Sequence, residues 1–292
     1  MTILVSGSTG NIGRQVLQQL EGSGAQVRAL MRDPSKVQLP AGMQAVAGDF
    51  SDPASIRAAF HGVDTLFLLN AVVADEVTQG LTALNLAREA GIERIVYFSV
   101  LNADRFSSVP HFTGKYTVER MIEQFDLPAT VLRPSYFMQN DLGLKQALQQ
   151  GVYPSPVGGV GVAMVDTGDI AQIAAQALLR REQAASPLPR EVIELTGPQA
   201  LTGDALAAIW SQALGKPIAY GGDDSAAFEA NAVQYMPHWA AYDLRLMVEA
   251  FQRDGMLAKS TGLDVMTGLL GRAPRSYQDF AQSAVAAWQA EG

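Results

Sequence analysis

A lysine and a histidine stand four residues apart in a segment whose apolar spacing predicts a helix over residues 111–125. At that separation Lys115 and His111 lie one turn apart on the face that also carries the apolar residues, so we expect both to point inward. A buried lysine needs a polar partner, and the hydroxyls of a bound ribose would supply one. The alternative is a lysine whose stem lies along the apolar surface while its ammonium reaches water.

His111 has two interpretations. Its imidazole can donate a proton to a substrate, or it is a polar residue at the helix entrance after Pro110. The sequence leaves both open. The same helical spacing places Phe125 on the inner stripe. It places these residues on the outer face: Tyr116, Glu119, Arg120, Glu123 and Gln124.

Three glycines follow the first apolar segment, in the stretch Ser6-Gly7-Ser8-Thr9-Gly10-Asn11-Ile12-Gly13. We expect Gly7 to make a tight turn, Gly10 to let the backbone approach a pyrophosphate, and Gly13 to let the next helix pack close to the strand. That helix, over 12–21, presents free N–H groups and the positive end of its dipole to the phosphates. The alternative is a glycine-rich turn without a ligand. The order of strand, loop and amphipathic helix favours a dinucleotide site.

The end of the second predicted strand bears on the choice of dinucleotide. It presents Arg32, with Lys36 nearby, and a guanidinium suits the 2′-phosphate of NADP through charge and bidentate geometry. Asp33 is the competing signal, because an acidic residue in this region binds the 2′-hydroxyl of NAD. The alternative is that Arg32 and Lys36 are solvated surface charges. We predict NADP as the cofactor rather than NAD.

Short apolar segments alternate with helical patterns through the first half of the chain. Uniformly apolar strands separated by helices indicate a parallel sheet covered on both faces. The predicted fold is therefore α/β, a doubly wound Rossmann domain. The strands are predicted over residues 3–5, 27–31, 45–47, 64–69, 94–99 and 129–132, and the helices over 12–21, 53–60, 75–90 and 111–125.

The second half is richer in helices and in turns. We predict a smaller, mostly helical and discontinuous second domain over residues 136–165 and 197–292, with the Rossmann domain formed by 1–135 and about 166–196. The patterns predict helices over 169–180, 203–214, 225–235, 239–253 and 276–289, and a strand over 191–195.

Composition limits the functional classes. The 292 residues are 48% hydrophobic and carry a net charge of −8 without a cluster of Lys and Arg, so a nucleic-acid surface is not expected. No apolar run is long enough to cross a membrane, and no signal peptide is recognisable at the N-terminus. We expect a cytoplasmic protein with no membrane partner.

Several kinds of reactive site lack support. Cysteine is absent, which excludes disulfides, thiolate metal sites and cysteine nucleophiles. His61 and His238 have no acidic residue at metal-ligand spacing, and no serine lies in a G-x-S-x-G elbow. We therefore predict no metal site and no hydrolase activity.

Several motifs together resemble the NmrA-like group of atypical short-chain dehydrogenases/reductases. They extend over nearly the whole chain, and the His-x-x-x-Lys and late Gly-Arg segments are the more specific ones. The motifs are LVSGSTGNIG at 4–13, RDP at 32–34, GDF at 48–50, HFTGK at 111–115, LRPSYFMQN at 132–140, LTGP at 195–198, ALGKP at 213–217 and GRAPRS at 271–276.

The resemblance implies a set of cofactor contacts. It implies that Ser8, Thr9, Asn11 and Ile12 contact the phosphates, and that Asp49 and Phe50 lie near the adenine. It places Leu69, Asn70 and Ala71 beside the ribose, Ser99 and Val100 near the nicotinamide, and Lys115 on the nicotinamide ribose. Residues Pro134, Tyr136 and Phe137 would line the nicotinamide and substrate pocket.

The aromatic segment after the sixth strand stands at the sheet edge where open α/β sheets bind ligands. Tyr136, Phe137 and Met138 are candidate substrate contacts, and the alternative is that they pack between domains. The family includes NADPH-dependent quinone, azo-dye and triarylmethane-dye reductases. Short-chain dehydrogenases generally carry Tyr where this chain has His111, which argues against ordinary ketone chemistry.

The resemblance therefore implies an NADPH-dependent oxidoreductase that delivers hydride to a conjugated small-molecule acceptor. The family also contains regulators that bind NAD(P) without turnover, and such a protein would have a protein partner. Fold alone does not separate these functions. The sequence makes no prediction of the oligomeric state.

Overall fold

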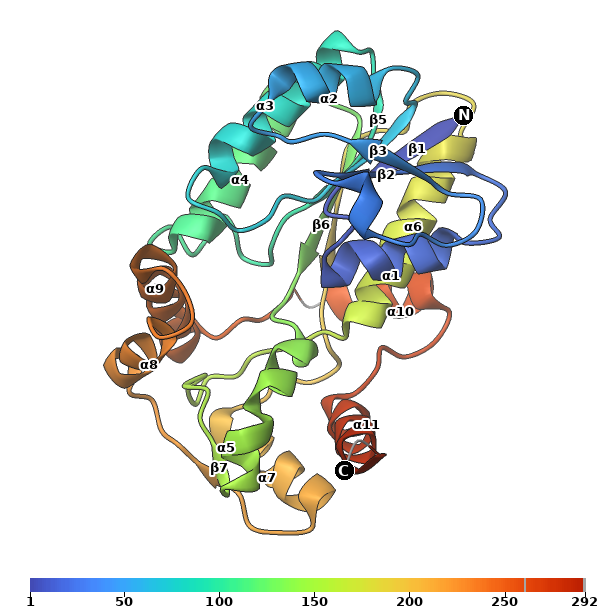
Figure 1. Cartoon of the computed structure of the whole chain (residues 1–292). Coiled ribbons are helices and arrows are strands. Elements are labelled where there is room, and N and C mark those ends of the chain that lie inside the picture. Colours follow the sequence, from blue (N-terminus) through green and yellow to red (C-terminus); the bar gives the residue numbers. More distant parts are fainter. Residues whose placement is uncertain (260, 291–292) are drawn as a thin grey trace. The chain divides into compact units, whose positions relative to one another are not determined.

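The structure is a computed structural model that describes residues 1–259 and 261–290, without the side chain of Lys36 (Figure 1). Its contacts divide the chain into two compact units. The first comprises residues 1–100, 114–133 and 167–193, and the second comprises residues 101–113, 134–166 and 194–292. The segment 101–113 joins the second unit, whereas the sequence prediction kept it in the Rossmann domain. Contacts within the second unit hold it there: Leu101 N–H donates to Pro134 O at 2.8 Å.

A seven-stranded sheet forms the centre of the first unit, in the order β3-β2-β1-β4-β5-β6-β8. Neighbouring strands from β3 to β6 pair in parallel, and Ile3 of β1 lies opposite Val27 of β2 on one side and Thr65 of β4 on the other. This is the strand order of a doubly wound nucleotide-binding fold, so the predicted fold class is confirmed. The strands are β1 (Thr2–Val5), β2 (Gln26–Met31), β3 (Gln44–Ala47), β4 (Thr65–Leu68), β5 (Arg94–Phe98), β6 (Ala129–Pro134) and β8 (Glu191–Leu195).

Helices cover both faces of this sheet (Figure 1). α1 (Asn11–Leu20) and α6 (Thr167–Gln183) lie together on one face. The other face carries α2 (Pro53–Phe60), α3 (Glu76–Glu89) and α4 (Pro110–Gln124), and a short 3-10 turn, η1 (Pro34–Lys36), follows β2. The apolar stripes of α2, α3 and α4 pack on the strands in one buried cluster, which explains why uniformly apolar strands alternate with amphipathic helices.

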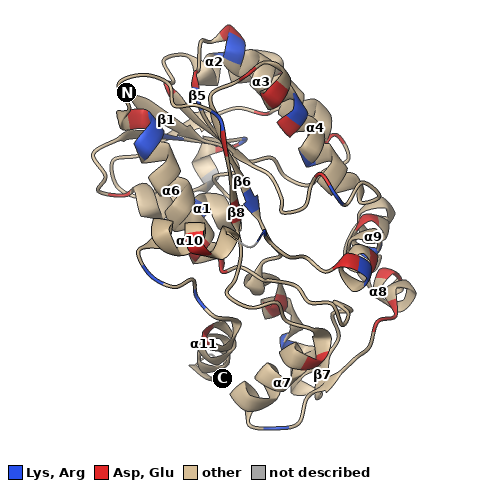
Figure 2. Ribbon diagram, turned by 180° about the vertical axis from the view of Figure 1, so that it is seen from behind, with Lys and Arg blue, Asp and Glu red and all other residues tan. Residues whose placement is uncertain are grey.

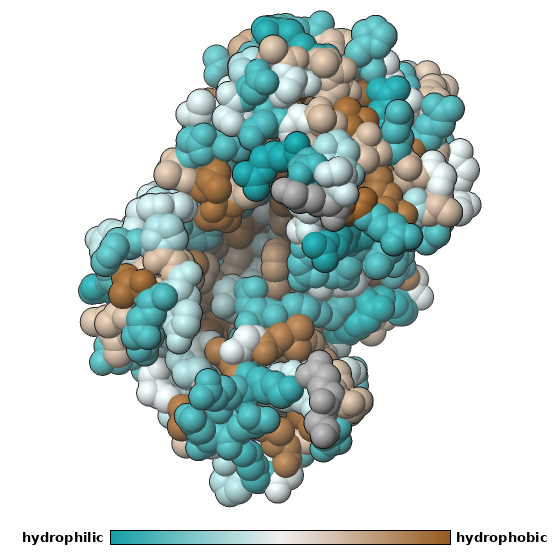
Figure 3. All heavy atoms as spheres, in the orientation of Figure 1, coloured by the Kyte–Doolittle hydropathy of each residue, from teal (hydrophilic) through white to brown (hydrophobic). Residues whose placement is uncertain are grey.

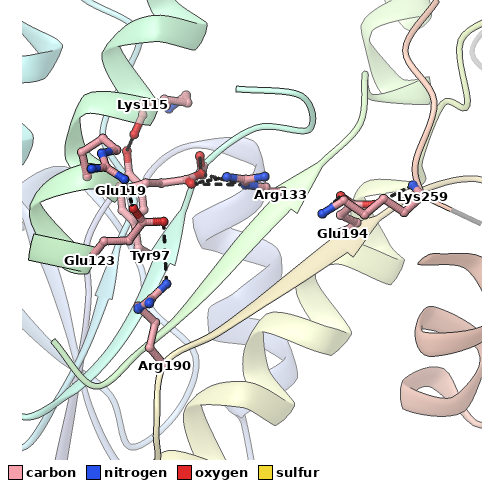
Figure 4. Close-up of polar contacts among 10 residues, drawn as sticks. Tyr97, Lys115, Glu119, Glu123, Arg133, Arg190, Glu194 and Lys259 are labelled. Carbon is pink, nitrogen blue, oxygen red and sulfur yellow. Dashed lines mark hydrogen bonds and ion pairs between the residues drawn. The ribbon is translucent and has the colours of Figure 1, made fainter. Parts of the chain in front are cut away.

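Helix α4 is tied to the sheet by a buried charge pair that the sequence did not predict. Glu119 is buried rather than on the outer face, because Arg133 of β6 donates to both its carboxylate oxygens, at 3.0 and 3.2 Å from Nε (Figure 4). The Ser99 hydroxyl also donates to this carboxylate. The prediction for Phe125 was also wrong. Its ring is 45% exposed and lies under the Arg88 guanidinium, 3.9 Å from the ring centroid.

The second unit is mostly helical around a buried tryptophan. Trp210 stacks on Trp288 with ring centroids 5.4 Å apart and meets Tyr277 edge-on, while its Nε1 donates to the Tyr277 hydroxyl at 2.8 Å. The elements are η2 (Met138–Leu144), α5 (Lys145–Gln149), β7 (Val152–Tyr153), α7 (Gly203–Leu214), β9 (Ala219–Tyr220), α8 (Ser225–Ala232), α9 (His238–Asp254), α10 (Gly262–Leu270) and α11 (Tyr277–Ala290).

The sequence analysis missed several elements of this unit and extended one too far. η2, α5, β7 and β9 are too short for a periodic signal. α10 was also overlooked, because it begins at a glycine and Gly268 interrupts its pattern. α8 ends at Ala232, three residues before the predicted end, because the chain must turn before Pro237 starts the next helix.

The described surface mixes charges of both signs and mixes polar with apolar residues. Basic and acidic residues are interspersed along the described ribbon in Figure 2, and the face drawn in Figure 3 is a mosaic of hydrophilic and hydrophobic residues. Among the described residues, no helix is both long enough and apolar enough to cross a membrane.

The packing of α1 gives a stability prediction. A Cβ on Gly13 would lie 2.1 Å from Gly7 O, a backbone atom that cannot move aside, whereas a Cβ on the exposed helical Gly268 meets nothing within 4 Å. We expect Gly13→Ala to lower the free energy of unfolding by about 1–3 kcal/mol, the usual cost of overpacking. Gly268→Ala, the matched control, gains helix propensity and should raise it by up to about 1 kcal/mol. Equal unfolding midpoints of the two variants in urea would contradict this packing.

Candidate functional site

The glycine loop between β1 and α1 has the geometry of a phosphate cradle. Gly7 has φ +61°, and a side chain there would meet Leu69 at 2.8 Å. Gly10 is extended, with φ −81° and ψ 173°, and a Cβ there has a single contact within 4 Å, Gly7 O at 3.3 Å. The fold therefore requires glycine at 7 and 13, while the space at Gly10 is open to a ligand. The first N–H groups of α1 follow directly, as anion binding requires.

Two buried serines fix the loop against the strands. Ser6 Oγ accepts from Leu69 N–H at 2.8 Å, and Ser8 Oγ donates to Leu30 O at 2.6 Å. The Ser8 hydroxyl thus links the loop to β2. The phosphate contact predicted for Ser8 would therefore come from its backbone N–H rather than from its side chain. Thr9 and Asn11 are exposed, and Asn11 Oδ1 accepts from Gln15 at 2.8 Å. Ile12 is buried under the first turn of α1.

A cavity of about 230 Å³ adjoins this loop within the first unit. It is smaller than the roughly 300–1,000 Å³ of pockets that enclose a whole ligand, so it suits one end of a dinucleotide. Seven predicted cofactor residues line it: Gly7, Thr9, Arg32, Asp49, Phe50, Leu69 and Ala71. Leu30, Met31, Gly48, Val73 and Gln79 complete the lining and were not predicted.

The structure separates the roles of Arg32 and Asp33. Arg32 lines the cavity, whereas the Asp33 carboxylate caps η1 by accepting from Ser35 N–H at 3.1 Å and from Ser35 Oγ at 2.6 Å. Asp33 is not among the residues that line the cavity. Hydrogen bonds from Ser51, and then the positive charge of Arg32, hold the pKa of the Asp49 carboxyl below its usual value. The predicted contact of Lys36 lies outside the described side chains.

Asn70 is buried at the end of β4 with an unsatisfied side chain. It is 5% exposed, and neither its Oδ1 nor its Nδ2 has a hydrogen-bond partner in the described structure. Its neighbours Leu69 and Ala71 both line the cavity. A buried amide without partners costs free energy unless a ligand satisfies it. Asn70 itself is not among the lining residues, and the ribose contact that the family resemblance implies for it stays a prediction.

Lys115 is buried in the first unit and paired with a carboxylate. Its Nζ lies 2.6 Å from Glu76 Oε1, and the two side chains are 8% and 7% exposed. The Tyr97 hydroxyl donates to Lys115 O at 3.4 Å (Figure 4). Lys115 is therefore not a lysine whose ammonium reaches water. Glu76 was missed, although an acidic residue in the first turn of a predicted helix was the available signal. Its ion pair occupies one of the three ammonium donors.

Ser99 and Val100 follow β5 in the same unit. The Ser99 hydroxyl donates to Glu119 and is buried, so its side chain positions α4, and Val100 is half-buried. No described contact tests the nicotinamide role that the resemblance implies for either residue. Pro134 ends β6 and is buried.

His111 is held by a carboxylate in the second unit, to which the first four residues of α4 belong. Its Nδ1 lies 2.6 Å from Asp243 Oδ2, and its backbone N–H donates to Asp243 Oδ1 at 3.3 Å. Asp243, on α9, is 2% exposed. The carboxylate thus caps α4 and orients the imidazole. No pattern in the sequence pointed to Asp243, which is separated from His111 by 132 residues.

The aromatic segment after β6 also packs on α9. Tyr136 is half-buried, meeting Phe251 edge-on with ring centroids 5.7 Å apart, and burial followed by the charge of Asp141 raises its pKa well above the usual value. Phe137 is half-buried and pairs with Val165 through a β-bridge. Met138 has no exposed surface, which favours a packing role over contact with a substrate.

A buried carboxyl lies among tyrosines in the second unit. Asp141 Oδ2 accepts from the Tyr153 hydroxyl at 2.9 Å and from the Tyr277 hydroxyl, whereas Oδ1 is buried without a partner among the described residues. Burial, against the lowering effect of these two hydrogen bonds, raises the pKa of Asp141 to about 6.

The raised pKa of Asp141 should make the free energy of unfolding depend on pH. Because the pKa of Asp141 is higher in the folded than in the unfolded chain, its stabilising contribution is complete below about pH 4 and is lost as the pH rises through about 6. The loss is on the order of 2–3 kcal/mol. We expect the difference in unfolding free energy between Asp141→Asn and the wild type to shift in favour of the variant by this amount between pH 4 and 7. A difference that does not change with pH, measured by urea denaturation, would refute it.

Comparison with known proteins places the chain in a family. Residues 1–270 match the NmrA-like family. The chain is 32% identical to an NAD(P)H azoreductase from Xenophilus azovorans over 296 residues, covering 99% of both chains. A crystal structure of an NADPH-dependent quinone oxidoreductase from Escherichia coli in complex with NADPH superposes with a TM-score of 0.85, at 26% identity, covering 96% of this chain and 99% of that one.

The fold is also shared with a protein of another kind. The structure of NmrA, described as a negative transcriptional regulator, matches with a TM-score of 0.75 at 18% identity, covering 96% of this chain and 94% of that one, and this likeness shows the fold alone. The chain belongs to the NmrA-like family, as its motifs predicted.

Proposed function

We propose that this chain is an NADPH-dependent oxidoreductase that reduces a conjugated small molecule, such as a quinone or an azo or triarylmethane dye. The observation that carries the proposal is the cavity beside the glycine loop, which Arg32 lines together with six other residues that the sequence analysis assigns to the cofactor. The buried amide of Asn70, next to two of the lining residues in the chain, adds a polar group without a partner among the described residues.

The relatives support catalysis over regulation. The azoreductase and the quinone oxidoreductase are named as NAD(P)H or NADPH enzymes, and each aligns with almost the whole of this chain. The regulatory alternative rests on the structural similarity to NmrA, and at 18% identity that similarity shows only a shared fold. A small-molecule acceptor follows from the same relatives. Membership of the wider short-chain dehydrogenase group and a cytoplasmic location remain predictions.

Residues of the first unit would hold the cofactor. The N–H groups at the start of α1 would bind the pyrophosphate, the lack of a side chain at Gly10 would let it approach, and Asn70 would bond a ribose hydroxyl. Lys115, with one donor on Glu76, would keep two donors for the hydroxyls of the nicotinamide ribose. The bound cofactor supplies a hydride. Tyr136 and Phe137 would contact the flat acceptor.

A direct assay tests this proposal. Purified protein is incubated with NADPH and with 1,4-naphthoquinone, methyl red or crystal violet, and the loss of NADPH absorbance is followed. We expect acceptor-dependent oxidation with at least one of them. NADPH that binds but is never oxidised with any acceptor would favour the regulatory alternative, and absence of binding would overturn the proposal.

Arg32 should set the preference for NADPH. A charge-assisted hydrogen bond to the 2′-phosphate contributes about 1.5–3 kcal/mol, which corresponds to roughly tenfold to hundredfold tighter binding of NADPH than of NADH. We expect Arg32→Ala to erase most of this preference with little change in the NADH dissociation constant. Dissociation constants are measured at one fixed ionic strength, because salt screens phosphate contacts.

Arg57→Ala is the matched control, since Arg57 is an exposed arginine of the same unit paired with Glu89, away from the cavity. It should leave both constants unchanged. Tighter binding of NADH than of NADPH by the wild type would show instead that Asp33 determines the choice.

A further inference from the structure

The pair formed by His111 and Asp243 has an arrangement that suits proton transfer. The imidazole is oriented by a carboxylate at 2.6 Å on Nδ1, and Nε2 has no hydrogen-bond partner among the described residues. The His111 side chain is 11% exposed, whereas that of Asp243 is 3% exposed. A buried carboxylate that fixes the Nδ1–H tautomer and leaves Nε2 to the reactant is the arrangement used for histidine acids and bases.

We infer that His111 is the proton donor to the reduced acceptor and that Asp243 is its positioning residue, so that the acceptors are compounds that must gain a proton together with the hydride. Quinones and azo compounds belong to this class, and cationic triarylmethane dyes do not. The inference rests on the proposed function. Its structural support is local to the second unit, where α9 carries Asp243 and the start of α4 carries His111.

Reduction of an azo compound requires one hydride and one proton. One nitrogen forms an N–H bond with the hydride of the reduced nicotinamide, the π pair of the N=N bond moves to the other nitrogen, and that nitrogen takes the proton from Nε2 of the His111 imidazolium. The azo compound is reduced to a hydrazine, and the nicotinamide is oxidised by two electrons. Histidine is left neutral with its proton on Nδ1 against Asp243, and water then restores the proton on Nε2.

Reduction of a quinone to a hydroquinone also requires one hydride and one proton. Hydride adds at one oxygen, the electrons pass through the conjugated ring to the other oxygen, and that oxygen takes the proton, giving a hydroquinone. A triarylmethane cation differs, because hydride at its central carbon gives a neutral product with no proton. The requirement for His111 therefore depends on the acceptor, and a purely structural role would not produce that dependence.

The surrounding packing supports a fixed ring. The His111 ring meets Phe112 edge-on, with ring centroids 4.7 Å apart. Phe112 packs on Phe106 with centroids 5.5 Å apart, and Phe106 packs on Phe251 of α9 with centroids 6.2 Å apart. Tyr136 meets the same Phe251. His111 and Tyr136 thus both pack on α9, at positions eight residues apart, which is about 12 Å along the helix axis.

The test compares reaction rates between acceptors. Turnover of methyl red, 1,4-naphthoquinone and crystal violet is measured with saturating NADPH for the wild type, His111→Gln and Asp243→Asn. Both changes keep side-chain size, and in Asp243→Asn the amide oxygen can still accept from the backbone of α4. We expect the ratio of the methyl red or quinone rate to the crystal violet rate to fall about 100-fold in His111→Gln, within the usual range for a general acid. It should fall at least about tenfold in Asp243→Asn, because the carboxylate that orients the imidazole is lost.

Two further measurements separate this role from folding and from cofactor binding. The chain has three histidines, so the imidazole nitrogens of His111 can be assigned in ¹⁵N spectra of the cofactor-free protein. We expect Nδ1 to carry a proton in the wild type, both in the imidazolium that donates from Nε2 and in the neutral form left afterwards, and we expect the neutral form of Asp243→Asn to lose this preference. NADPH dissociation constants should stay within about twofold of wild type. His238→Gln, an exposed histidine on α9, is the control and should leave the rate ratio unchanged.

The outcomes are distinguishable. If the wild type oxidises NADPH with these acceptors but the rate ratio is the same in His111→Gln, the inference is wrong and the proposed function stands. A neutral Nε2–H tautomer in the wild type would also overturn it. If the wild type oxidises NADPH with none of the acceptors, the proposed function fails and the inference fails with it.

Discussion

The close approach between α1 and the loop before it is the contact on which the nucleotide site depends. The backbone of Gly13 packs so near to Gly7 O that no side chain fits between them, and this fixes where the first N–H groups of α1 point. The Ser6 and Ser8 hydroxyls then bind the loop to the ends of β4 and β2. Because Met31 at the end of β2 and Leu69 after β4 both line the cavity, the tight turn lies directly beside it.

Buried charge is concentrated along helix α4. Within the first unit, Lys115 pairs with Glu76, and Glu119 pairs with Arg133. Buried ion pairs seldom stabilise a fold more than apolar residues of the same size would. The Glu119 pair makes several hydrogen bonds to the sheet and fixes the helix. The Lys115 pair keeps a cation at a defined place in the proposed site, which is a reason for retaining it.

Much of this site follows from local patterns in the sequence. The order of strand, glycine loop and helix specified the nucleotide fold, and the inward face of α4 specified that Lys115 is buried. Local patterns could not supply the partners. Glu76 and Asp243 stand 39 and 132 residues from the side chains they bind, so only the tertiary fold brings them together.

The predictions that failed did so because contacts formed only in the folded chain overrode the local pattern. Glu119 is charged, and charge alone assigns it to the outer face of a helix, but Arg133 on the neighbouring strand compensates its burial. Asp33 competed with Arg32 in the sequence, and the short turn at Ser35 that engages its carboxylate became visible only in the structure. The second unit was harder to predict because its short elements depend on packing around Trp210 rather than on periodicity.

The central claim is that the first unit binds NADPH through the glycine loop, and calorimetric titration of Gly10→Val tests it most directly. Gly10 has ordinary extended dihedral angles, and a Cβ there would have one contact within 4 Å, Gly7 O at 3.3 Å, so the valine variant should still fold, with some loss of stability. Its side chain would occupy the space of the pyrophosphate. We predict that the wild type binds NADPH and that the folded variant has lost at least about 100-fold in affinity, a difference of roughly 2.7 kcal/mol. Equal affinity of the two proteins for NADPH would contradict this account.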